Sequence, residues 1–203
     1  MRWAVLVGGT GSNLRAILSQ RLPVSLVISH RAGVKALDVA KEFNVPARVL
    51  IPRDYGDRAD YDGALSGLLE RYEIERVAMA GFLRWLGNGM INRYRGAIVN
   101  LHPSLLPAYP GLHAIERAFQ DKVHWSGVTV HFVDEGHDTG PAIAQAPVPR
   151  LIHDSLEEFA DRIHAVEHRL YPRALKALDA GELRWENGRI IYEGEDQQWM
   201  HGH

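Results

Sequence analysis

Short apolar runs alternate with amphipathic segments through the first half of the sequence. The runs are too short for buried helices and are apolar on both faces, which is typical of parallel strands covered by helices. Strands are expected at Trp3 to Gly8, Val24 to Ser29, Ala47 to Leu50 and Val77 to Ala80, and helices at Ser12 to Arg21 (opened by a Ser/Asn cap), Gly33 to Phe43 and Asp57 to Tyr72. This order predicts βαβ units and a parallel sheet.

The second half has a different pattern, with strand-like runs that a polar loop separates. The expected elements are an antiparallel pair at Gly127 to Val133 and Pro141 to Val148, a helix from Ser155 to about Ala180 with a Ser155/Glu158 capping box and a stop at Gly181, and a hairpin at Leu183 to Tyr192 around Asn187-Gly188. We therefore predict a single α/β domain over residues 1–203. Its Rossmann-like open sheet is parallel in the N-terminal half, gains antiparallel strands in the C-terminal half and has helices on both faces. Residues 194–203 are expected to form a frayed tail.

Composition excludes several classes of function. The 203 residues contain no cysteine, so neither a disulfide nor a thiolate nucleophile is available. With 23 basic and 25 acidic residues the chain has no broad basic surface, and nucleic acid is not an expected partner. No stretch approaches the roughly 20 apolar residues of a membrane span, and no signal peptide is recognised. We expect a cytoplasmic protein without a membrane partner.

The first candidate site is Gly8-Gly-Thr-Gly-Ser-Asn13, at the turn from the first strand into the first helix. Glycines allow a ligand to approach the backbone, and the helix N-terminus favours an anion. Leu14 stands where the dinucleotide fingerprint needs a third glycine, and His30-Arg31 replaces its ribose-binding acid. The turn is therefore either a phosphate site or an ordinary tight turn.

A second candidate site combines Asn100, His102 and Asp138. Asn100 and His102 stand two residues apart at the end of an apolar strand that Pro103 breaks, so both project from one face. An amide and an imidazole can stabilise an oxyanion, and the imidazole can also transfer a proton. Asp138 belongs to a glycine-bounded acidic loop, 134–140, between the two later strands. Taken singly, each group also fits a purely structural role.

In combination these motifs resemble a known family. Asn100-x-His102-Pro-Ser-Leu-Leu-Pro107, Tyr109-Pro-Gly-Leu-His113, Gly127-Val-Thr-Val-His131 and Asp138-x-Gly-Pro141 are similar, in order and separation, to the signature of the folate-dependent formyltransferases, specifically their glycinamide ribonucleotide branch. The resemblance covers Leu6 to about Leu183. It implies formyl transfer from 10-formyltetrahydrofolate to the amine of phosphoribosylglycinamide in purine synthesis.

The resemblance also implies roles for single residues. Asn100 and His102 would stabilise the oxyanion, and Asp138 would orient His102 or take the amine proton through a water. The substrate-binding residues would be Gly11, Ser12 and Asn13 at the phosphate, Glu167 at the ribose hydroxyls, and His164, which stands where relatives often have Lys or Gln near the phosphate. The folate-binding residues would be Arg58, Leu83, Arg84, Trp85, Leu86, Glu135, Gly136, His137 and Asp138. Arg58 stands where a relative's arginine reaches the folate tail, and Trp85 replaces a smaller aliphatic residue.

Other functions remain open at this stage. One is a formyltransferase or formyl-folate hydrolase with another acceptor, although such relatives usually carry an extra domain and this chain has 203 residues. Another is a nucleotide-binding module without acyl transfer, which leaves Asn100, His102 and Asp138 unexplained. The 11 histidines show no recognised metal-ligand spacing, so we expect no metal. The partners would be the two small-molecule substrates, and the protein a monomer or homodimer.

Overall fold

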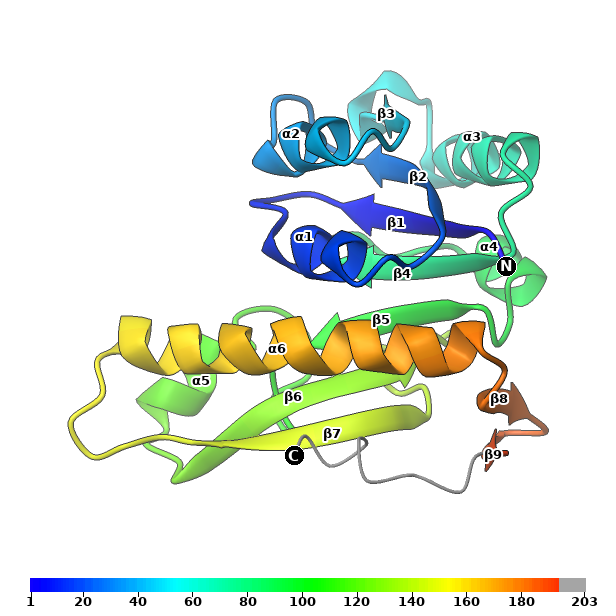
Figure 1. Cartoon of the computed structure of the whole chain (residues 1–203). Helices are drawn as coiled ribbons and strands as arrows, with labels where there is room; N and C mark the ends of the chain where they lie inside the picture. Colours follow the sequence, from blue (N-terminus) through cyan, green and yellow to red (C-terminus); the bar gives the residue numbers. More distant parts are fainter. Residues whose placement is uncertain (194–203) are drawn as a thin grey trace. The chain divides into compact units, whose positions relative to one another are not determined.

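The computed structural model describes residues 1–193. The chain divides into two compact units, Met1–Val99 and Asn100–His203, and the predicted tail at 194–203 lies outside the described residues. Seven strands have the order β3-β2-β1-β4-β5-β6-β7, and a two-stranded sheet pairs β8 with β9. Figure 1 labels these elements along the chain.

The first unit is a βαβ series. Its elements are β1 (Trp3–Val7), α1 (Ser12–Ser19), β2 (Val24–Ser29), α2 (Lys35–Glu42), β3 (Ala47–Val49), the 3-10 turn η1 (Pro52–Asp54), α3 (Arg58–Arg71), β4 (Arg76–Ala80), α4 (Asn88–Arg93) and the start of β5 (Ile98–His102). Strand β1 pairs in parallel with β2 and β4, and β2 with β3. All five residues of β1 are fully buried, as expected of a central strand covered on both faces.

The second unit contains the rest of β5, α5 (Ala114–Gln120), β6 (Trp125–Phe132), β7 (Ala142–Pro149), α6 (Leu156–Asp179), β8 (Leu183–Glu186) and β9 (Arg189–Tyr192). Strands β6 and β7 are antiparallel, and α6 packs along both of them (Figure 1). The prediction of a mixed α/β sheet, parallel first and antiparallel later, is therefore confirmed.

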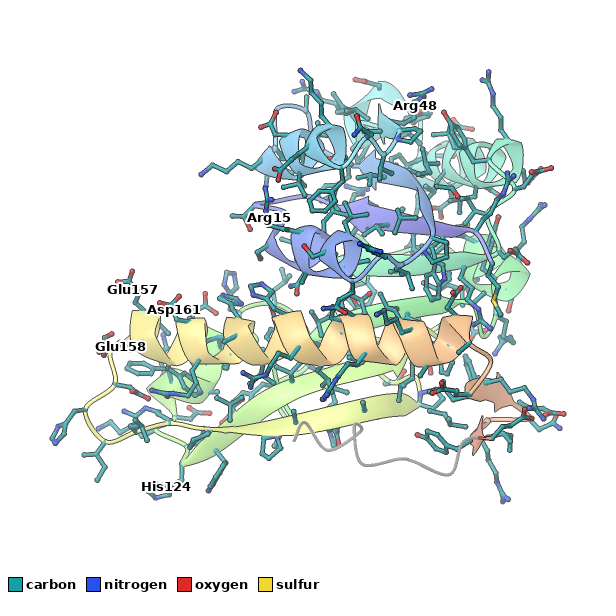
Figure 2. All side chains as sticks on the ribbon, in the orientation of Figure 1. Arg15, Arg48, His124, Glu157, Glu158 and Asp161 are labelled. Atoms are coloured by element: carbon teal, nitrogen blue, oxygen red, sulfur yellow. The ribbon has the colours of Figure 1, made fainter. Side chains whose placement is uncertain are left out.

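Helix α6 has the ends that the sequence predicts. Ser155 is its N-cap, with a complete capping box to Glu158, and Ala180 is its C-cap. Gly181 follows with φ of 76°, in the left-handed conformation that favours glycine after a helix. Figure 2 shows Glu157, Glu158 and Asp161 grouped at the start of α6, where negative charges stabilise the N-terminal end of the helix dipole.

One predicted cap is wrong. Helix α1 begins at Ser12, and its N-cap is Gly11, with φ of 80° and no side-chain capping bond. Gly11 also packs tightly, because a Cβ atom there would lie 2.7 Å from the Cα of Ala36. Glycine is required at this position both by its backbone conformation and by contact with α2, so Gly11, and not Ser12 or Asn13, is the N-cap.

The sequence did not predict two short helices, α4 and α5. They have six and seven residues, fewer than two full turns, so apolar spacing gives them little periodic signal. The N-cap of α5, His113, has φ of 57°, a conformation that no standard start signal indicates. Among the described residues, no helix is long and apolar enough to cross a membrane.

Candidate active site

Asp138 lies in the loop between β6 and β7 and is held in an uncommon conformation. Its φ is 55°, in the left-handed region that aspartate tolerates better than most residues and that recurs at functional sites. Its Oδ2 accepts a hydrogen bond from the backbone N–H of Gly111 at 2.8 Å and lies 3.4 Å from Nδ1 of His102. Within the second unit, the structure therefore places Asp138 beside His102.

The same loop is braced from within by a second acid. Asp134 Oδ1 accepts hydrogen bonds from the N–H of Gly136 at 3.1 Å and from the hydroxyl of Thr139 at 2.8 Å. A Cβ atom at Gly136 would lie 1.9 Å from Oγ1 of Thr139, so glycine makes this tight fold possible. The two acids thus differ in their contacts, since Asp134 shapes the loop and Asp138 faces the histidines.

His102 is buried at the end of β5, and its two ring nitrogens have different partners. Nε2 lies 2.8 Å from the carbonyl oxygen of Tyr109. Because a carbonyl only accepts, Nε2 carries a proton and donates it there. Nδ1 faces the Asp138 carboxylate, so a proton placed between Nδ1 and Oδ2 is stabilised by both groups.

His131 is a site residue to which the sequence analysis gave no role, although it ends the Gly127-Val-Thr-Val-His131 motif. It is buried in β6, where its Nδ1–H donates to the carbonyl of Phe132 at 2.9 Å. Its Nε2 lies 3.3 Å from Nδ2 of Asn100 and 3.7 Å from Oδ1 of Asp138. The available signal was a histidine within an otherwise apolar strand directly before the acidic loop.

The protonation of His131 determines how Asn100 is held. Burial lowers the pKa of His131, although the carbonyl of Phe132 and the charge of Asp138 oppose the shift. In the neutral ring with a proton on Nδ1, Nε2 accepts one amide hydrogen of Asn100. That bond orients the amide and leaves its second hydrogen available to a ligand.

The first unit carries the glycine turn and the segment after β4. Gly11 forms the turn, and Ser12 and Asn13 lie in the first turn of α1. A Cβ atom at Gly8 would lie 1.9 Å from Cε1 of the buried His30, so only glycine fits at position 8 beside this histidine. The N-terminus of α1, which no side chain caps, has the geometry of an anion site.

The segment after β4 is irregular and exposes two large apolar side chains. Leu83 is 66% and Trp85 48% exposed, whereas Leu86 is buried. The guanidinium of Arg84 lies over the ring of Tyr61, 5.4 Å from its centre. Arg58, predicted to reach a folate tail, donates through Nη2 to the carbonyl of Leu86.

On α6, Glu167 is buried, and its Oε2 lies 3.1 Å from Nδ1 of the half-exposed His164. This hydrogen bond is the main cause that raises the pKa of His164, and burial opposes it. Glu135, Gly136 and His137 lie in the loop with Asp138. Within residues 1–193, no group of three or more His, Asp or Glu side chains could hold a metal ion.

Comparison with known proteins identifies the family. Residues 1–175 match the formyl transferase family. The chain belongs to this family. A phosphoribosylglycinamide formyltransferase from Bacillus subtilis (strain 168) is a formyl transferase relative with 38% identity over 183 residues, which cover 87% of this chain and 94% of the relative.

Further formyl transferase relatives include longer proteins and a solved structure. The trifunctional purine biosynthetic protein adenosine-3 of Bos taurus is 41% identical over 202 residues, 96% of this chain, and the chain spans only 20% of its length. The crystal structure of glycinamide ribonucleotide transformylase 1 from Symbiobacterium toebii superposes with a TM-score of 0.91 at 40% identity, and the match covers 96% of this chain and 94% of that one.

Proposed function

We propose that this chain transfers the formyl group of 10-formyltetrahydrofolate to the amine of phosphoribosylglycinamide. Membership of the formyl transferase family supports the proposal, and so do relatives named phosphoribosylglycinamide formyltransferase and glycinamide ribonucleotide transformylase. The observation that carries it is the contact network of Asn100, His102, His131 and Asp138 within the second unit.

In this proposal Asn100 binds the oxyanion that forms when the amine attacks the formyl carbon. One amide hydrogen is used by Nε2 of His131, so the other can donate to the developing negative oxygen. The amide does not have to reorient during the reaction because His131 already fixes it, and such preorganised donors typically contribute about 3 kcal/mol each.

The His102 and Asp138 pair handles the proton. As nitrogen attacks, the amine becomes acidic, and its proton passes to Asp138, directly or through a water. His102 Nδ1, 3.4 Å away, can accept the hydrogen of the protonated carboxyl group and so stabilises the proton that Asp138 receives. When the tetrahedral intermediate collapses, the folate nitrogen leaves and takes up a proton, which the same pair returns.

The substrate phosphate is assigned to the turn of Gly11 and to Ser12 and Asn13, because the start of α1 has no side-chain cap. The ribose hydroxyls are assigned to Glu167, and His164 contributes positive charge near the phosphate. The pterin ring is assigned to the segment of Leu83, Arg84, Trp85 and Leu86, where the backbone of Arg84 and Leu86 would meet it. Loop residues Glu135, Gly136, His137 and Asp138 are also assigned to the folate.

We further propose that residues 1–203 act as one formyltransferase domain, as a cytoplasmic monomer or homodimer that needs no metal. The boundary between the two compact units, after Val99, lies inside β5. Independent domains usually meet at exposed linkers instead of within a strand.

The test is an ultraviolet assay of folate deformylation with and without phosphoribosylglycinamide. The proposal expects turnover only when the ribonucleotide is present, with formylated ribonucleotide as the product. Equal rates with and without the amine would identify a formyl-folate hydrolase and overturn the transferase. Stabilisation of the protein by NAD alone, with no effect of either substrate, would instead indicate a dinucleotide-binding module.

A further inference from the structure

The segment after β4, residues 82–87, has no regular secondary structure, so side chains must fix its conformation. At its start Phe82 is buried, with its ring edge-to-face with His30 and the ring centres 4.8 Å apart. At its end, the fixing groups come from helix α3. The segment is thus held at both ends, while Leu83 and Trp85 between them are exposed.

Two residues of α3, one turn apart, hold the backbone at Leu86 and Gly87. Arg58 donates through Nη2 to the carbonyl of Leu86. Asp62 accepts through Oδ2 from the N–H of Gly87 at 2.8 Å. Nε of Arg58 lies 3.7 Å from the same Oδ2, so the two side chains also interact with each other.

The contact at Gly87 is built for close approach. A Cβ atom there would lie 2.2 Å from Oδ2 of Asp62, so any other residue would displace the carboxylate. Asp62 is only 12% exposed, and its Oδ1 is buried without a hydrogen-bond partner. Leaving a buried carboxylate oxygen unsatisfied is unfavourable for stability, which suggests that the arrangement serves another purpose.

We propose that Asp62 and Arg58 are positioning residues for the folate: they preset the backbone of residues 84–87 so that it meets the pterin ring in one conformation. The inference depends on the proposed function, in which this backbone binds the pterin. It differs from the sequence prediction for Arg58, because the guanidinium acts through the Leu86 carbonyl and not on the folate tail. A prearranged binding segment raises affinity because less ordering is required when the ligand binds.

The first experiment compares Asp62→Ala with Asp62→Asn, which keeps an oxygen to accept from Gly87. Asp62→Ala is expected to raise the KM for 10-formyltetrahydrofolate at least about tenfold, with kcat and the KM for phosphoribosylglycinamide changed less than about twofold. Asp62→Asn should restore most of the folate KM. Glu70→Ala, which removes an exposed ion pair of the same helix with Arg93 at 2.8 Å, is the matched control and should leave both KM values unchanged.

The second experiment separates positioning from direct contact with the tail. Arg58→Met leaves the bond between Asp62 and Gly87 in place, so it also serves if Asp62→Ala does not fold. Its KM should rise by the same factor for 10-formyltetrahydrofolate and for 10-formyltetrahydropteroate, which lacks the glutamate tail. A rise only for the tail-bearing donor, or a folate KM unchanged in both Asp62→Ala and Arg58→Met, overturns the inference. A wild-type chain that neither binds nor deformylates the folate would overturn the proposed function as well.

Discussion

At the scale of single residues, the site depends on a carboxylate that faces two histidines. Asp138 lies within 3.4 Å of His102 and 3.7 Å of His131, while the hydrogen bonds of Asp134 in the same loop brace the turn. Asp138 and Asp134 are the same residue type with different contacts, so they form a matched pair for mutation.

Asp138→Asn should lower kcat by about 100-fold to 10,000-fold, because an amide cannot take up the amine proton. The KM for phosphoribosylglycinamide should change little, since the amide oxygen can still accept from Gly111. Steady-state assays of Asp138→Asn beside Asp134→Asn would measure both values. Near-normal kcat in Asp138→Asn would move the proton transfer to another group.

Burial lowers the pKa of His131, and the sign gives a pH dependence of stability. In the unfolded chain a histidine protonates below about pH 6.5, whereas folded His131 resists protonation. The stability that neutral His131 contributes is therefore present above about pH 6.5 and is lost as the pH falls below this value. Urea unfolding at pH 7.5 and 5.0 should show a smaller acid loss for His131→Gln than for the wild type. His124→Gln, at an exposed histidine visible in Figure 2, is the control, and equal losses in all three proteins would contradict the assignment.

The contacts of His131 show why sequence reasoning found only part of the site. Asn100, His102 and Asp138 stand in short motifs with a recognisable order. The link through His131 depends on distances between side chains 31 and 7 residues apart in sequence, to Asn100 and Asp138. Only the folded arrangement of β5, β6 and their loop brings these atoms together, so no local pattern encodes it.

At the scale of elements, long segments with complete end signals were predictable and short ones were not. Helix α6 continues through Pro172 and ends beside Gly181 as its caps indicate. Helices α4 and α5 are short, and neither start has a side-chain capping bond. For α1, the packing of Gly11 against Ala36 decided the start, which is a tertiary effect.

The capping box of α6 should contribute measurably to stability. Ser155 accepts from the N–H of Glu158, and Glu158 accepts from the N–H of Ser155. Ser155→Ala removes the first bond and should lower the free energy of unfolding by about 1 kcal/mol. Denaturant titration would measure the loss, and an unchanged midpoint would show that the capping bond does not contribute to stability.

Also on α6, His164 and Glu167 lie one turn apart and should make ribonucleotide affinity depend on pH. Glu167 raises the pKa of His164 through its hydrogen bond, the charges of Asp161 and Glu116 act in the same direction, and His168 is the neighbouring histidine. The imidazolium therefore persists above about pH 6.5 and is lost as the pH rises through the elevated pKa. The KM for phosphoribosylglycinamide should be lowest at pH values below this elevated pKa and should increase as the pH rises above it.

His164→Lys is the control for this pH effect, because lysine keeps its charge across the range. Its KM for the ribonucleotide should stay flat between pH 6 and pH 8.5, whereas His164→Gln should show a raised KM throughout. A wild-type KM that does not change with pH would remove His164 from the phosphate site.

At the scale of the whole molecule, the question is whether the two compact units unfold together. The boundary after Val99 divides β5 between Ile98–Val99 and Asn100–His102. Breaking a strand in the middle would expose its backbone N–H and C=O groups, and leaving such groups without partners is costly. The boundary between the two compact units therefore lacks the exposed linker that usually separates domains.

We expect calorimetry to show one unfolding transition whose calorimetric and van't Hoff enthalpies agree. Saturating phosphoribosylglycinamide at about 100 times its Kd should stabilise that transition by about 2.7 kcal/mol, and the shift should appear over the whole signal because one cooperative unit carries it. Tryptophan fluorescence gives an independent check, since Trp3 belongs to β1 and Trp125 to β6. Single-tryptophan variants that retain one or the other should report the same midpoint. Separate midpoints, with the ligand moving only one of them, would show two independently folding units and refute the single-domain proposal.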